Sequence, residues 1–310
     1  MRFIVVWLLL LLACSGTKQD SGLGEPLRVQ NGVFREGILP GVTTDAGAGL
    51  TITAVDTAST VLRPGQGEKT LSGRAAVGTV AIGIALGGAG TGWWLLPVDG
   101  PDPLNAGELG WNAILEIARN VLPGPNELRI VPIDATGKAG QQRALPVCIP
   151  RIVPDNLNAC DPVANAPPAA IVSLTWDTAV DLDLVVVGPD GTVVDAKHPQ
   201  GKTSADAGAD AGAYPSIDRD SNGACALDLV NQEDLVFATA PSGTFLVYAN
   251  LFSACGNAPV HFRLGVAYRT RGADGAYALT ETVVKSGTLV ALDANGGARL
   301  GTFVTSLAFP

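Results

Sequence analysis

Histidine, charged residues and basic clusters are all scarce in this 310-residue chain, and each scarcity excludes a kind of function. With only two histidines, His198 and His261, a metal site built from several histidines is excluded. Charged residues make up 16% of the chain, the net charge is −9, and no run of lysines and arginines occurs. Because nucleic acids require clustered basic side chains to replace their counterions, the sequence predicts no nucleic-acid partner.

Common catalytic motifs are lacking as well, so the sequence predicts a protein without enzymatic activity. It contains neither a G-x-S-x-G nucleophile motif nor an H-E-x-x-H zinc motif. Asp181 and Asp183 could be read as a glycosidase pair. Two acids on one strand face, however, do not flank a sugar ring from opposite sides.

Glycine and proline are abundant, with 38 and 21 residues that separate short apolar segments. Frequent turns and few helical charge pairs favour an all-β fold. The length suffices for two domains of ordinary size. We therefore predict two β-sandwich domains in tandem, over 25–149 and 169–310, with strand favoured over a short helix at 111–118. The tail, 277–309, predicts three strands with turns at 285–287 and 293–297.

The segment 150–168 contains five prolines and predicts a semi-rigid, extended linker between the two domains. In the first domain, Trp93 and Trp94 are adjacent. Successive strand residues face opposite ways, so at most one of these rings can be an exposed platform for a ligand. The alternative, which we favour, is that both tryptophans are buried in the sandwich core.

The N-terminus predicts export from the cell. Arg2 precedes an apolar run of ten residues, 3–12, which would rise only about 15 Å as a helix, half of a bilayer core. The end of this run, Leu11-Leu12-Ala13, followed by Cys14, resembles the lipobox of bacterial lipoproteins. This resemblance implies cleavage after residue 13, acylation of Cys14 (palmitate among the acyl groups) and a tether over 14–24. It places the protein on the cell envelope, at the outer membrane rather than the inner one. The alternative is an ordinary secretory signal.

Four cysteines remain if Cys14 carries lipid, and an even number in an exported protein predicts disulfides. Three pairings are possible. Sequence proximity favours Cys148 with Cys160 and Cys225 with Cys255.

Two acidic motifs in the second domain predict a cation site. On a strand, Asp181 and Asp183 project their carboxylates from one face, where the two like charges repel. The sequence D-R-D-S-N-G at 218–223 matches the start of a calcium-binding loop, although no glutamate follows at its twelfth position. We predict that calcium binds Asp218, Asp220 and Asn222, with further oxygens from candidates elsewhere: Asp177, Asp181, Asp183, Glu233 and Asp234. The sequence leaves open whether the two motifs meet in space.

Two resemblances accompany these motifs. The pattern W-D-x-x-x-D-L-D-L-x-V-x-x-P-x-G from Trp176, followed by D-x-D-S-N-x-x-C, E-D-L-V-F and P-x-G-T-F-L-V-Y-A-N, resembles a family of bacterial envelope proteins of unassigned function. That family is similar in style to pre-peptidase C-terminal domains, which are small β-sandwiches, often calcium-bound. In the first domain, D-A-x-G-x-A-G from Asp134 resembles the last hairpin of bacterial immunoglobulin-like domains, with the aspartate as a side-chain cap and a glycine at positive φ.

Together these features predict a non-catalytic, lipid-anchored envelope protein with a structural or interaction role. The alternatives are an adhesion module that binds an envelope polysaccharide or a peptide, and an accessory module of a hydrolase.

Overall fold

The computed structural model describes residues 21–41, 49–201, 215–228 and 230–309. The predicted signal peptide, Cys14 and most of the predicted tether lie outside these residues. In the part of the chain that is described, no helix is both long and apolar enough to cross a bilayer.

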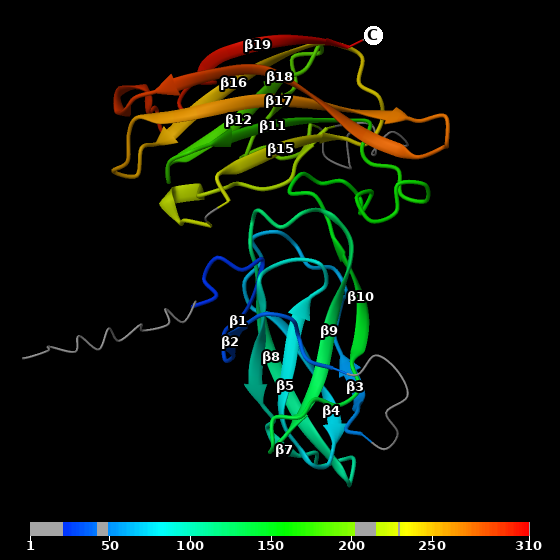
Figure 1. Ribbon diagram of the computed structural model, residues 1–310. Helices are drawn as coiled ribbons and strands as arrows, with labels where there is room; N and C mark the ends of the chain where they lie inside the picture. Colours follow the sequence, from blue (N-terminus) through cyan, green and yellow to red (C-terminus); the bar gives the residue numbers. More distant parts are fainter. Residues whose placement is uncertain (1–20, 42–48, 202–214, 229, 310) are drawn as a thin grey trace, which may run out of the picture.

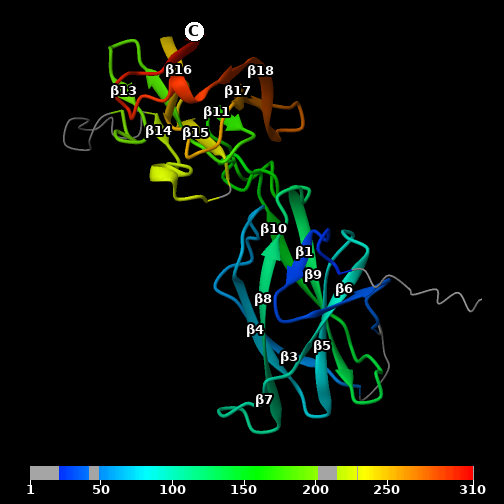
Figure 2. The same cartoon turned by 90° about the vertical axis from the view of Figure 1, so that its left-hand side faces the viewer.

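The chain folds into two β-sandwich domains, as predicted, and they lie end to end in both views (Figures 1 and 2). One sheet of the first domain contains β1 (Leu27–Val29), β8 (Glu108–Ile117), β4 (Lys69–Ala76) and β3 (Ile52–Asp56), with β7 (Gly100–Pro101) also paired to β8. The other sheet contains β10 (Arg143–Ile149), β9 (Gly124–Asp134), β5 (Thr79–Leu86), β6 (Gly92–Pro97) and β2 (Val33–Glu36). The segment 111–118 is therefore strand rather than helix, as favoured.

The second domain has the same two-layer plan. One sheet contains β14 (Ser216–Ile217), β15 (Gln232–Phe237), β11 (Ala170–Trp176), β17 (Val260–Arg271) and β18 (Tyr277–Leu289). The facing sheet contains β13 (Val193–Val194), β12 (Asp181–Val187), β16 (Gly243–Ser253) and β19 (Thr302–Phe309). Two short 3-10 helices, η2 (Gly223–Cys225) and η3 (Ala291–Asp293), lie in its connections.

Each sandwich buries a core of its own, because apolar residues alternate along its strands. In the first core, Trp111 of one sheet and Ile82 of the other are both buried between the two sheets. In the second core, Leu174 and Leu182 are buried in the same way. The hairpin that joins β9 to β10 also forms as predicted. Asp134 caps it by accepting hydrogen bonds from backbone N–H groups, and Gly137 has a φ of 82°.

The tail differs from the prediction of three strands. β18 continues without a turn from Tyr277 to Leu289, and β19 is the only other strand within 277–309 of the described chain. Gly287, taken for a turn residue, lies inside β18, where a Cβ would come 2.5 Å from the ring of Phe262. Its role is therefore to admit a close aromatic contact rather than to reverse the chain.

The linker is also different from the extended segment expected, because it folds into turns. Asp155 is 2% exposed, and its carboxylate accepts hydrogen bonds from the N–H groups of Leu157 and Ala159, each at 3.0 Å. Asn158 donates to the carbonyl of Tyr277 in β18 at 3.1 Å, which fastens the linker to the second domain. The disulfide between Cys148 and Cys160 fastens it to β10.

Candidate metal centre

Three carboxylates converge on the second sandwich. Asp181 and Asp183 come from β12, Asp220 comes from the turn after β14, and their ligand oxygens lie within 4.8 Å of one another. Asp181 is 2% exposed and Asp183 is 8% exposed, whereas Asp220 faces solvent. The two acidic motifs therefore meet in space, through one of the three predicted loop ligands, Asp220, and two of the further candidates, Asp181 and Asp183.

Asp181 and Asp183 lie together because of the period of the strand. Leu182 and Leu184 point into the core, so Asp181 and Asp183, which alternate with them, project from the opposite face of β12. β13 is too short to pair with Leu184, whose N–H instead donates to the carboxylate of Glu233 at 2.7 Å. The local strand geometry thus presents both aspartates on one side.

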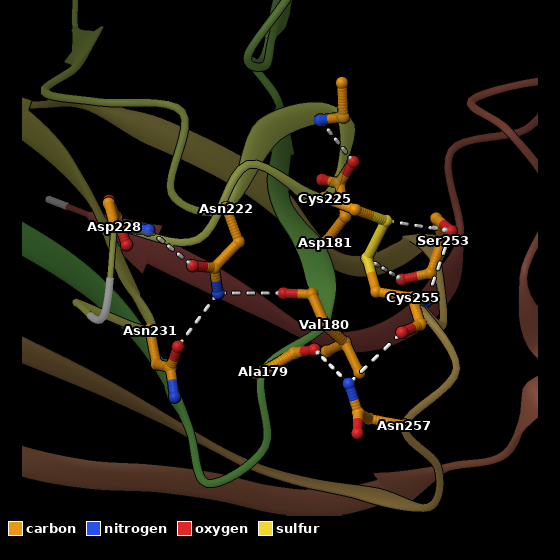
Figure 3. Close-up of a disulfide and its surroundings, with 11 residues drawn as sticks. Ala179, Val180, Asp181, Asn222, Cys225, Asp228, Asn231, Ser253, Cys255 and Asn257 are labelled. Atoms are coloured by element: carbon orange, nitrogen blue, oxygen red, sulfur yellow. Dashed lines mark hydrogen bonds between the residues drawn. A yellow bond between two sulfur atoms is a disulfide. The ribbon is translucent and has the colours of Figure 1, made fainter.

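Asp220 is held in place by the residues that follow it in the turn. Asn222, at a φ of 61°, donates to the carbonyl of Val180 at 3.0 Å and to the side chain of Asn231 at 2.8 Å (Figure 3). A Cβ at position 223 would lie 2.6 Å from the carboxylate oxygens of Asp220. Gly223 therefore leaves room for that carboxylate, a different role from the turn glycine of a calcium loop.

Asp218 and Asn222, both predicted as calcium ligands, are engaged elsewhere. The carboxylate of Asp218 accepts a hydrogen bond from the N–H of Asp234 at 2.9 Å and pairs with Arg219 at 2.7 Å. The amide oxygen of Asn222 accepts from the N–H of Asp228 at 3.1 Å. Both side chains thus organise the turn, and the structure does not bring them to the carboxylate cluster.

A disulfide braces the cluster from the side. Cys225, the last residue of η2, is joined to Cys255 after β16, and Cys148 is joined to Cys160, which is the pairing favoured by sequence proximity. The N–H of Ala224, next to Cys225, donates to the carboxylate of Asp181 at 2.9 Å. Figure 3 shows Asp181 beside this disulfide. The covalent bond therefore holds the turn that carries Asp220 against β12.

The electrostatics of the cluster are unfavourable without a cation. Burial raises the pKa of Asp183 to about 7, with further increases from the charges of Asp181, Asp220 and Asp195, while Lys197 opposes them. Burial likewise raises the pKa of Asp181 to about 6, and the charge of Asp220 adds to it, against the N–H of Ala224. No hydrogen bond from any described residue reaches the carboxylate of Asp183.

The other acidic candidates are already satisfied by hydrogen bonds. Glu233 is fully buried and accepts from the N–H groups of Leu184 and Ser221, and burial raises its pKa well above the ordinary value. Burial also raises the pKa of Asp234 to about 7, although Ser173 and Gln232 donate to its carboxylate. Asp177 accepts from the N–H of His261 at 2.9 Å. These three acids support the strands around the cluster.

Two residues near the cluster were missed by the sequence reasoning. Asp183 borders a pocket of about 260 Å³ that is also lined by Asp195 and Asn250. Asn250 lies opposite Asp183 in the pairing of β12 with β16, and it is 4% exposed. The asparagine closes the motif P-x-G-T-F-L-V-Y-A-N, but only the strand register places it beside the aspartate.

The tryptophan pair of the first domain does not form an exposed platform. Trp94 is 7% exposed, donates from Nε1 to the carbonyl of Leu27 at 2.7 Å and packs against Phe34. Trp93 is half-buried, with its ring close to Gly83. Trp94 is therefore buried, as the sequence analysis favoured, whereas Trp93 is only partly buried.

Comparisons with known proteins do not assign a family. No protein-family model matches the chain, and no curated protein matches it. Among solved structures, the fibronectin(III)-like modules of Clostridium thermocellum CbhA share 11% identity with a TM-score of 0.19, over 81% of this chain and 96% of theirs. BcpA, the major pilin subunit of Bacillus cereus, shares 10% with a TM-score of 0.21, over 76% and 66%.

A third structure, Bacteroides ovatus SGBP-B in complex with a mixed-linkage heptasaccharide, shares 14% identity with a TM-score of 0.15, over 73% of this chain and 42% of that one. At TM-scores this low, these likenesses carry no argument about what the present chain does.

Proposed function

We propose that the protein is a non-catalytic, lipid-anchored component of the bacterial cell envelope whose second β-sandwich is stabilised by calcium. The ion would bind between Asp181, Asp183 and Asp220. The observation that carries this proposal is the carboxylate of Asp183, which is 8% exposed, lacks a hydrogen bond from the described residues and faces two further carboxylates. Burial and the neighbouring carboxylates disfavour the ionised form of Asp183, and the charge of Lys197 offsets only part of this cost. A divalent cation would offset the rest.

The donor set favours calcium over transition metals. The three side chains offer only oxygen ligands, which suit hard cations, and neither histidine belongs to the cluster. Calcium takes six to eight oxygens, and carboxylates bind it through one or both oxygens. Asp220 faces solvent, so water can complete the coordination. A requirement for near-ideal octahedral geometry makes magnesium the less suitable ion.

The stabilisation by calcium is expected to depend on pH. In calcium-free protein, the pKa values of Asp181 and Asp183 are raised to about 6 and about 7. The stability that their protonated forms contribute is complete below about pH 4 and is lost as the pH rises through 6 and 7. Bound calcium favours the ionised carboxylates and restores that stability. Differential scanning calorimetry should therefore show a small calcium-induced rise in Tm of the second domain near pH 5 and a large one near pH 8. Equal shifts at both pH values would contradict the assignment.

The lipid anchor rests on the N-terminal sequence alone. Expressed in a Gram-negative host with labelled palmitate, the full-length protein should incorporate label and fractionate with membranes. The Cys14→Ala variant should lose both, whereas the control Ser21→Ala should keep both. A cleaved, unlabelled and soluble wild-type protein would instead indicate an ordinary secretory signal.

A further inference from the structure

A second polar site lies at the junction of the two domains, where the chain passes from β10 into the second sandwich (Figures 1 and 2). It is a pocket of about 450 Å³. Five of the chain's 20 lysines and arginines line it, although the chain carries a net charge of −9: Arg28, Arg63, Arg119, Arg151 and Arg219. We call it the arginine pocket.

The arginine pocket is assembled from both domains. Arg28 lies in β1, Arg63 and Arg119 lie in connections of the first domain, and Arg151 lies in the linker. Arg219 comes from the second domain, in the turn that precedes η2. A ligand that contacts Arg219 together with Arg28, Arg63 or Arg119 would bridge the two sandwiches.

Acidic side chains neutralise this positive charge only in part. Two acids, Glu116 and Asp228, line the pocket beside the five arginines. Glu116 pairs with Arg28 at 2.7 Å, Asp218 with Arg219 at 2.7 Å, and Asp155 with Arg151 at 4.0 Å. The side chain of Arg63 makes no ion pair within the described chain.

Two arginines that line the pocket from different domains, Arg119 and Arg219, repel each other. Arg119 donates to the carbonyl of Val230 in the second domain. Burial lowers the pKa of Arg119, and the charge of Arg219 lowers it further, whereas Asp228 opposes both effects. An anion placed between them would offset this repulsion.

We propose that the arginine pocket binds a small anion with two or more negative charges (a dicarboxylate, sulfate or phosphate) and that this ligand bridges the two domains. Guanidinium groups present planar, paired N–H donors that match such groups in bidentate geometry. The volume of the pocket lies within the range of small-molecule sites. This proposal is independent of the calcium site, because the two involve different residues.

The test is isothermal titration of the full chain with succinate, sulfate and inorganic phosphate, at constant ionic strength in metal-free buffer. We expect saturable binding of at least one of these divalent anions, and none of acetate or chloride. Arg63→Gln and Arg219→Gln, one from each domain, should each weaken binding by about tenfold or more, since each removes charge-assisted hydrogen bonds.

Arg129→Gln serves as the control, because Arg129 pairs with Glu127 on β9 and does not line the pocket. Its binding should match that of the wild type, and melting curves should show that every variant folds. Absence of saturable binding by all three anions, or equal weakening in the control, would overturn the proposal. Weakening by the Arg63 variant alone would overturn the bridging of the domains.

Discussion

In calcium-free buffer near pH 8, the Asp183→Asn variant is expected to melt at a higher temperature than the wild type, and calcium should raise its Tm much less than it raises that of the wild type. The carboxylate of Asp183 is buried beside two others, and its pKa is raised to about 7, so its ionised form destabilises the apo fold. A neutral amide of similar shape removes that charge. The unfolding free energy of the calcium-free variant is expected to exceed that of the wild type by at most about 2 to 4 kcal/mol.

The smaller response to calcium follows from the same substitution. A ligand at a hundredfold excess over its Kd stabilises the folded state by about 2.7 kcal/mol. For a domain of this size, that corresponds to a rise in Tm on the order of 10 °C. With one carboxylate removed, most of this rise should disappear.

The control is Asp274→Asn, at an exposed turn of the second domain. It should leave both the calcium-free Tm and the calcium-induced shift close to those of the wild type. If Asp183→Asn instead lowers the Tm equally with and without calcium, Asp183 has a purely structural role. Calorimetry on the three proteins separates these outcomes.

The second large effect is expected from removal of the disulfide between Cys225 and Cys255. In the chain-entropy model, closing this loop contributes about 3.7 kcal/mol, given a sequence separation of 30. The variant Cys225→Ser/Cys255→Ser should also lose calcium affinity by about tenfold or more. The disulfide holds the turn that supplies Asp220, and the neighbouring N–H of Ala224 bonds to Asp181.

The other disulfide provides a matched comparison. The bond between Cys148 and Cys160 has a sequence separation of 12, and its removal should cost about 2.9 kcal/mol. Because it joins β10 to the linker, its loss should leave calcium affinity unchanged. Equal losses of calcium affinity in the two double variants would show that the Cys225 disulfide does not organise the carboxylate cluster.

Strand periodicity accounts for what the sequence could predict. Alternation of apolar residues and frequent turn residues indicated two sandwiches, and a spacing of two placed Asp181 and Asp183 on one face. Proximity along the chain was enough to indicate both disulfide pairs, since each joins two cysteines that are consecutive in the sequence. These are local features, so a single sequence contains them.

Tertiary hydrogen bonds account for what it could not predict. Asp218 and Asn222 match a calcium loop by type and spacing, but their oxygens accept hydrogen bonds from the N–H groups of Asp234, in β15, and Asp228, beyond the motif. A motif cannot show that such partners will occupy its oxygens. Gly287 was misread for the same reason, because its contact with Phe262 exists only in the paired sheet.

The arginine pocket was invisible to the sequence for a related reason. Its five basic residues come from five separate segments, and only the packing of the two domains brings them together. The sequence contains no basic run, so the distribution of charge along the chain indicates only that basic residues are fewer than acidic ones.

The most direct test of the central claim is a calcium titration of the full chain by isothermal calorimetry, in metal-free buffer near pH 8. We expect saturable binding of one calcium per chain to the cluster of Asp181, Asp183 and Asp220. The same titration of Asp183→Asn should show little or no binding. Absence of saturable heat with the wild type, or an unchanged isotherm with the variant, would contradict the account.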